Sequence, residues 1–418
     1  MMFSIEMRLG DERMKQMDNA TYRWVIVAAG GFLGCIAIGA MFALPIFITP
    51  MVDATGWSRT GISSAMTIGF LAMAFGSFMS GALADRYGPK LVVLAGSVLL
   101  AVALALAAQA TSLLVFQLLF GLCVGGAASA IMAPLMAAVA GWFDTQRSLA
   151  ISLVSAGFGL APATMSPLAA WLVSRHDWRV SMLILSAIVV CTMIPLSFLI
   201  RRPPALEAQA AGAPTPAHEP QMSVKTALLS PPFLILALTN FFCCATHSGP
   251  IFHTVSYAIS CGIPLVAATS IYAVEGIAGM AGRIGFGFAG DRFGAKVVLA
   301  TGLLAQAAFA LAYAFVNQLP GFYTVAALFG FTYAGVMPLY SVLARENFPL
   351  SMMGTIIGGT AMAGSLGMAT GPLAGGLIYD HFASYAWLYI GAAGMGLGAF
   401  LAAISFRPHG QEALAAAE

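Results

Sequence analysis

Arg283 is the basic residue placed deepest within an apolar stretch of this sequence, in the segment 278–285. A guanidinium in a membrane interior is costly, so it persists where an anion, a polar cavity or a water path offsets its charge. Its planar fork can hold a carboxylate through two parallel hydrogen bonds. We therefore predict that Arg283 is the counter-charge of an anionic ligand. The structural alternative is an arginine bonded to a neighbouring helix for packing, or one nearer the membrane interface.

The longer apolar stretch around Arg283 also contains Glu275, an acid that lies well inside it. At about 100° per residue, Tyr272, Glu275, Gly279 and Arg283 fall within an arc of about 80° on one helix face. The rise of 1.5 Å per residue puts Glu275 about 12 Å from Arg283 along the axis. A carboxyl group removed from water favours its protonated form. Glu275 is thus our first candidate for a proton site, and a structural acid bonded to another helix is the alternative.

A second polar constellation lies upstream. Asn240, Cys244 and His247 share a helix face, and His253 follows Pro250, where the helix is expected to bend or break. Because histidine titrates near neutral pH, His247 and His253 are further candidates for carrying a proton or donating to an anion. A histidine that only bonds a facing helix is the structural alternative.

Composition sets the class of protein. The 418 residues are 60% hydrophobic and only 8% charged, which is typical of a polytopic membrane protein. The net charge of +2 and the lack of basic runs interleaved with aromatic residues argue against nucleic-acid binding. Charged residues interrupt the first twenty positions, so we interpret them as a tail and not a signal peptide. The six cysteines lie in apolar stretches and are interpreted as core residues, without metal-ligand spacing.

Stretches of about twenty apolar residues predict twelve membrane spans. They are 22–50, 58–84, 91–110, 113–141, 148–173, 179–200, 229–258, 264–289, 296–316, 320–344, 352–378 and 385–406. These boundaries predict an N-terminal tail at 1–21, a bundle of six helices at 22–200, a central loop at 201–228, a second bundle at 229–406 and a C-terminal tail at 407–418.

The basic residues favour one orientation. If both termini are cytoplasmic, fourteen lysines and arginines lie inside, and Arg59, Arg175 and Arg179 lie outside. The positive-inside rule then predicts cytoplasmic termini.

The two halves repeat each other. The segment 81–90, with the sequence GALADRYGPK, recurs at 287–296 as GFAGDRFGAK, and each copy joins the second and third spans of its half. Duplication explains this better than chance.

This repeated loop resembles the signature loop of the major facilitator superfamily, and the resemblance covers essentially the whole chain. It implies an all-α membrane protein with twelve transmembrane helices in two pseudo-symmetric six-helix bundles. Glycines permit the tight turn, and the charged side chains can hold helix ends by charge-assisted bonds. The resemblance assigns these residues to gating: Gly81, Asp85, Arg86, Gly88, Asp291, Arg292 and Gly294.

Within the superfamily, the position of Arg283 resembles the monocarboxylate and oxalate/formate transporter branch, in which an arginine of the eighth span binds a carboxylate. The segment 229–233, at the entry to the seventh span, is also similar. Two departures prevent copying proton coupling from that branch: Gly279 stands where an Asp is usual, and no Lys follows Arg23 in the first span. Gln117 stands where many proton-coupled members have an Arg, which argues against a drug/proton antiporter.

The resemblance implies secondary transport of a small organic anion, most readily a monocarboxylate, by alternating access. Arg283 would bind the carboxylate, with polar contacts from Tyr333, Gln117, Asn240 and Tyr340. Proton symport is preferred; an oxalate/formate type anion exchanger and a proton-coupled drug or metabolite exporter are the alternatives. We expect no enzyme, cofactor or metal, and a monomer in the lipid bilayer of the plasma membrane (the inner membrane of a bacterium), with protons as co-substrate.

Overall fold

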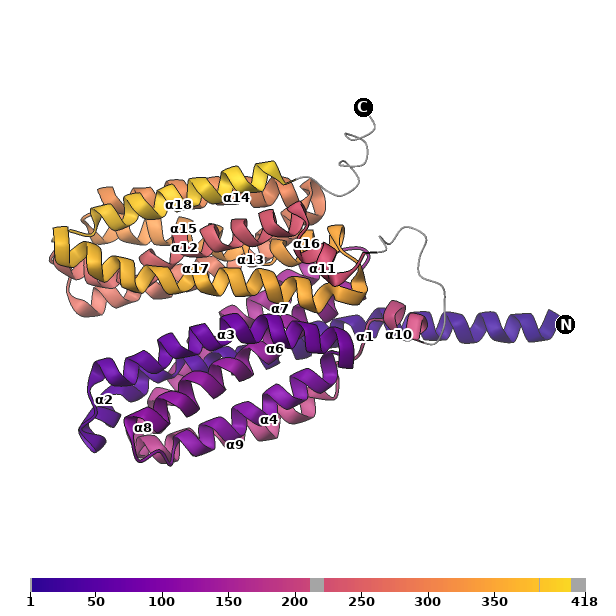
Figure 1. The fold of residues 1–418 in the computed structure, drawn as a ribbon, viewed down its shortest axis with the longest axis horizontal. Helices are drawn as coiled ribbons and strands as arrows, with labels where there is room; N and C mark the ends of the chain where they lie inside the picture. The colour runs from indigo at the N-terminus through magenta and orange to yellow at the C-terminus, as the bar shows by residue number, and fades with distance from the viewer. Residues whose placement is uncertain (1, 211–221, 383, 407–418) are drawn as a thin grey trace.

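The structure is a computed structural model that describes residues 2–210, 222–382 and 384–406, and its regular elements are helices. The predicted C-terminal tail at 407–418 and part of the predicted central loop lie outside the described residues. Figure 1 shows two bundles of long helices, one from each half of the chain. The predicted all-helical, two-bundle fold is confirmed.

The first bundle provides six spans, of which three are interrupted. Its elements are α1 (Met2–Phe42), α2 (Leu44–Thr55), α3 (Arg59–Tyr87), α4 (Pro89–Ala107), α5 (Leu113–Phe116), the π-helix η1 (Gln117–Val124), α6 (Gly125–Trp142), α7 (Arg147–Gly159), α8 (Ala161–Arg175) and α9 (Trp178–Ser197). The short helices α10 (Pro204–Ala210) and α11 (Val224–Leu228) belong to the connection.

The second bundle repeats this arrangement. Its elements are α12 (Pro231–Ser260), α13 (Leu265–Phe293), α14 (Ala295–Ala312), the 3-10 helix η2 (Tyr313–Phe315), α15 (Leu319–Val336), α16 (Leu339–Asn347), the 3-10 helix η3 (Leu350–Met352), α17 (Met353–Phe382) and α18 (Ala386–Ser405).

Prolines account for several helix breaks. The fifth span divides into α7 and α8 just before Pro162, and the tenth divides into α15 and α16 next to Pro338, because proline lacks the N–H that a continuous helix needs. The expected break at Pro250 does not occur: α12 continues through it to Ser260. Neighbouring helices in a membrane bundle can tolerate such a proline.

Among the described residues, ten helical segments are long and apolar enough to cross a membrane on length and composition alone. The described parts of the fifth and eighth predicted spans do not meet this measure. The fifth is divided into helices of 13 and 15 residues. The eighth, α13, is 29 residues long but carries Glu275 and Arg283 among many glycines, which lowers its mean hydropathy. The predicted twelve-span topology is consistent with these helices.

The two bundles meet along two equivalent helix pairs. Helix α3 packs along α17, and α7 packs along α13. Gly81 and Gly354 face each other so closely that a Cβ on either would collide with the other's backbone carbonyl. Gly88 and Gly294, which end α3 and α13, have φ values of 90° and 87°, where a side chain would be strained. These glycines place the repeated loops at one end of the molecule, which we call the motif end.

We predict opposite effects of alanine at two adjacent glycines of α6. A Cβ at Gly125 would overlap the backbone of Gly69 on α3, whereas nothing lies within 4 Å of a Cβ at Gly126. Gly126→Ala should therefore stabilise the protein by about 0.5–1 kcal/mol through helix propensity. Gly125→Ala should destabilise it by about 1–3 kcal/mol, because the two backbones must separate. Thermal unfolding of the purified variants in detergent measures both, and equal melting temperatures would contradict this packing.

Candidate functional site

Arg283 reaches from α13 in the second bundle to α7 in the first. Its Nε donates to the Ser155 hydroxyl at 3.1 Å. Its guanidinium also lies against Gly159, where a Cβ would overlap it. Residues 155 and 159 are one turn apart, so one face of α7 provides both a hydrogen-bond acceptor and the space for the guanidinium. Arg283 therefore lies where the two bundles meet.

The partner of Arg283 is neutral. Within the described part of the chain, no aspartate or glutamate forms an ion pair with it. Ser155 satisfies one of its five N–H donors, and Arg283 also interacts with Tyr333 on α15 and with His247 on α12. The structure thus brings together the arginine and one of the tyrosines that the sequence proposed, and it leaves the positive charge without a protein anion among these residues.

Glu275 lies on the same helix and is only 3% exposed. Tyr333 on α15 interacts with its carboxyl group. Its Oε2 is buried and has no hydrogen-bond partner among the described residues. Gly330 allows α15 to approach this closely, because a Cβ there would overlap the backbone of Glu275. Tyr333 interacts with both Glu275 and Arg283, so it connects the acid to the cation.

The polar residues of α12 separate into different environments. The Asn240 amide donates to the Thr360 carbonyl of α17 at 2.8 Å and is occupied by helix packing. The ring of His247 lies 4.9 Å from that of Tyr333, centroid to centroid. His253 lies further along, with its ring 5.5 Å from that of Tyr385 and against Gly375. Of these three residues, His247 is the one whose ring contacts Tyr333.

Two other candidates use their polar atoms elsewhere. The Gln117 amide donates to the Gly61 carbonyl and the Ser64 hydroxyl of α3, both at 2.8 Å, within the first bundle. The Tyr340 hydroxyl donates to the Thr239 carbonyl at 3.4 Å in the second bundle. We leave both out of the substrate site proposed below.

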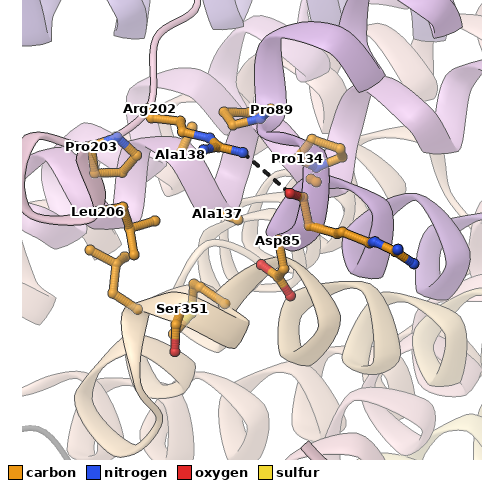
Figure 2. A pocket seen from close by; sticks show the side chains of 13 residues that line it. Asp85, Pro89, Pro134, Ala137, Ala138, Arg202, Pro203, Leu206 and Ser351 are labelled. Atoms are coloured by element: carbon orange, nitrogen blue, oxygen red, sulfur yellow. Dashed lines mark hydrogen bonds between the residues drawn. The ribbon is translucent and has the colours of Figure 1, made fainter. Parts of the chain in front are cut away.

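At the motif end, Asp85 caps a helix of the opposite bundle. Its carboxylate accepts from the backbone N–H groups of Gly354 and Thr355, each at 2.7 Å, and from the Thr355 hydroxyl at 2.6 Å. These groups begin α17, so the carboxylate also opposes the positive end of that helix dipole. Figure 2 shows Asp85 at a pocket of about 310 Å³, with Ser351 and Arg202 on its walls.

Asp291 repeats this interaction from the second bundle to the first. It accepts from the N–H groups of Ser148 at 3.0 Å and Leu149 at 3.1 Å, which begin α7. The two carboxylates are 206 residues apart, and so are the two N–H pairs, at 148–149 and 354–355. The internal repeat thus includes the partners as well as the loops. The Asp291 copy lacks the hydroxyl bond because position 149 is leucine.

The arginines of the two loops do not share this role in the structure. Arg86 and Arg292 are exposed, and each guanidinium lies over the aromatic ring of the following residue, at 5.2 Å and 5.5 Å from the centroids. A residue that the sequence did not single out, Arg202, donates to the Arg86 carbonyl at 3.3 Å (Figure 2).

Sequence reasoning missed the residues on the far side of each contact. Ser155 and Gly159 gave no signal, because a serine and a glycine in an apolar helix are common packing residues. Ser148 and Gly354 could have been found, since their spacing matches that of the two aspartates. Gln306, which contacts His247, is an isolated amide in the ninth span and carries no pattern.

Comparison with known proteins identifies the fold independently. A profile described as Major Facilitator Superfamily matches residues 30–358 and 285–417. Monocarboxylate transporter 13 of Bos taurus is 25% identical over 383 residues, which cover 91% of this chain and 87% of the relative. The gallate transporter of Pseudomonas putida is 31% identical over 182 residues, covering 42% and 39%. The structure of the proton:xylose symporter XylE aligns with a TM-score of 0.74 at 15% identity, covering 93% of this chain and 97% of that one.

We predict that Asp85→Asn opens the motif end. The amide would turn an N–H toward the N–H groups of α17, and loss of charge-assisted hydrogen bonds costs about 1.5–3 kcal/mol. This should shift the population toward separated bundles by roughly tenfold or more. Electron–electron distance measurements between spin labels at Lys90 and Lys296 report the separation. Arg86→Gln is the control and should leave the distances unchanged. A wild-type distance distribution for Asp85→Asn would show that Asp85 does not hold the motif end closed.

Proposed function

Because this chain belongs to the Major Facilitator Superfamily, and is a multi-pass membrane transporter and not an enzyme, we propose that it carries a small monocarboxylate. Arg283 supports this proposal most directly. It is a cation between the bundles whose described protein partner is a neutral serine, so a substrate carboxylate would supply the missing charge. The names of two relatives, a monocarboxylate and a gallate transporter, fit the same class of ligand.

Tyr333 completes the proposed anion site. Its ring lies beside that of His247, and it interacts with both Arg283 and Glu275. A phenol can donate to a carboxylate while its ring packs on the apolar part of the same molecule. We therefore assign Arg283 to the charge of the substrate and Tyr333 to its orientation.

We propose that Glu275 carries the coupled proton. The carboxyl group is buried, and one of its oxygens has no partner among the described residues. When substrate and proton bind together, the anion offsets Arg283 and the proton neutralises Glu275, which lowers the electrostatic cost of reorientation. The phenol of Tyr333 links the two sites, so substrate binding can be sensed at the carboxyl group. Proton symport is the mode that this arrangement favours, and anion exchange is the alternative.

The distribution of basic residues supports an orientation with the motif end and both termini in the cytoplasm. In that orientation Asp85 and Asp291 close the cytoplasmic side, and their release would open it. We propose that the protein works in this way as a monomer in the plasma membrane, which in a bacterium is the inner membrane.

Substitution of Arg283 tests the anion site. Arg283→Lys keeps the charge but loses the two-pronged geometry, and should raise the KM for carboxylates about tenfold. Arg283→Ala should raise it about a hundredfold or abolish uptake, because a buried charge pair is lost. Uptake of labelled monocarboxylates, aromatic and aliphatic, into proteoliposomes measures this.

Arg175→Gln is the matched control, since it removes an equal charge at an exposed position over Trp171. It should transport like the wild type. Wild-type affinity in both folded Arg283 variants would show that the carboxylate binds elsewhere, and no carboxylate uptake by active protein would refute the proposed substrate.

Glu275→Gln separates coupling from binding. The neutral amide mimics the protonated acid, so we expect exchange of carboxylates to continue while accumulation driven by a pH gradient is lost. The measurement is uptake with and without an inward proton gradient, beside counterflow in the same vesicles. If Glu275→Gln still accumulates substrate on a gradient, the coupled proton binds at another residue, of which His253 is the next candidate.

A further inference from the structure

Gln306 is a fully buried amide on α14, a helix that supplies none of the groups assigned above. It makes three hydrogen bonds to α12. Its Oε1 accepts from the Cys243 thiol at 3.4 Å, and its Nε2 donates to the Cys243 carbonyl at 3.1 Å. The same Nε2 lies 3.3 Å from Nδ1 of His247.

These bonds fix which hydrogen-bonding role each atom has. A backbone carbonyl can only accept, so the end of the Gln306 amide that faces the Cys243 carbonyl must be the nitrogen. That nitrogen has two hydrogens and no acceptor capacity. Its second hydrogen can point at His247, with Nδ1 as the acceptor; the competing arrangement, in which the ring donates to the Cys243 carbonyl, would set a ring N–H beside this N–H of Gln306.

Nδ1 can accept only when it carries no hydrogen, which leaves the ring hydrogen of His247 on Nε2. A doubly protonated ring would set an N–H against an N–H of Gln306, both inside the bundle. The geometry points to a positioning role: we propose that Gln306 holds His247 as a neutral imidazole whose Nε2–H donates to the substrate anion beside Arg283. This rests on the proposed function, and it makes His247 a ligand of the anion and not the proton carrier that its residue type first indicated.

The groups around His247 agree with a neutral donor. On α12 its neighbour is Cys243, α14 provides Gln306, and α15 stacks Tyr333 on the ring. From α13, Arg283 opposes a second positive charge on the ring, and Glu275 interacts with Tyr333. The titratable group that α18 sets against α12 is Tyr389, which is bonded to Thr254.

Helices α16 and α17, which also pack on α12, add no opposing charge. Helix α16 sets the Tyr340 hydroxyl against the Thr239 carbonyl. Helix α17 contributes the Thr360 carbonyl, which is occupied by Asn240. No described hydrogen bond occupies Nε2 of His247 within the protein. A neutral donor next to a fixed cation suits a carboxylate, since it adds a directed hydrogen bond without the cost of burying another ion.

The protonation pattern can be tested without any substrate. Full-length protein labelled with 15N-histidine and placed in lipid nanodiscs gives nitrogen signals that distinguish the two neutral forms from the charged ring, and His247→Gln identifies the signal of His247. We expect Nε2 to carry the hydrogen and Nδ1 to remain bare from about pH 8 to pH 5, across the usual range of histidine titration. A charged ring in this range, or a hydrogen on Nδ1, would overturn the proposal.

Gln306→Glu tests the consequence for transport. A carboxylate at 306 accepts a hydrogen from Nδ1, so above neutral pH His247 takes the opposite neutral form and its Nε2 loses the hydrogen that would bind the anion. We expect the KM for a monocarboxylate to rise about tenfold above neutral pH and to recover as the pH falls, with kcat changed less. Cys243→Ser is the control, because the backbone carbonyl that orients Gln306 remains, and its pH profile should match that of the wild type.

If Gln306→Glu and the wild type have the same pH profile of KM, His247 does not bind the anion. This conclusion holds whichever ring nitrogen of His247 carries the hydrogen. If wild-type protein transports no carboxylate, the proposed substrate fails, while the nitrogen signals still decide whether Gln306 fixes the ring. The two claims can therefore fail separately.

Discussion

A guanidinium half-buried between two helix bundles requires compensation, and the described part of this chain offers Arg283 a serine hydroxyl. In a medium where charge is expensive, such a site is stable only while water or an anion shares the space. The organisation around it follows from this requirement. Small residues on α7 make room for the guanidinium, and Tyr333 interacts with both Arg283 and the buried acid Glu275, which form no ion pair with each other.

The same two helices carry both the charge and one of the closing contacts. Helix α13 holds Arg283 and, in its last turn, Asp291, whereas α7 begins with the N–H groups that Asp291 accepts from and continues to Ser155. A ligand that draws Arg283 away from Ser155 therefore acts on the interface that Asp291 closes. Substrate binding and opening of the motif end can therefore be coupled through this pair of packed helices alone.

The sequence allowed prediction of the fold and of the charges, because both leave strong signals. Apolar length defines spans, and a repeated loop defines the two halves; Arg283 and Glu275 are conspicuous because ions are rare in such helices. The partners could not be predicted in the same way. Gln117 resembles a ligand in the sequence but bonds α3, whereas Gln306 bonds His247. Only packing distinguishes two amides that both lie in apolar helices.

The central claim is that the carboxylate of the substrate replaces the missing counter-charge of Arg283. An experimental structure with a bound aromatic monocarboxylate tests this most directly. The account predicts both carboxylate oxygens within hydrogen-bonding distance of the Arg283 guanidinium, with the Ser155 contact lengthened and the ring beside Tyr333. A carboxylate bound elsewhere while Arg283 remains on Ser155, or Arg283 paired with Glu275 in the complex, would contradict it.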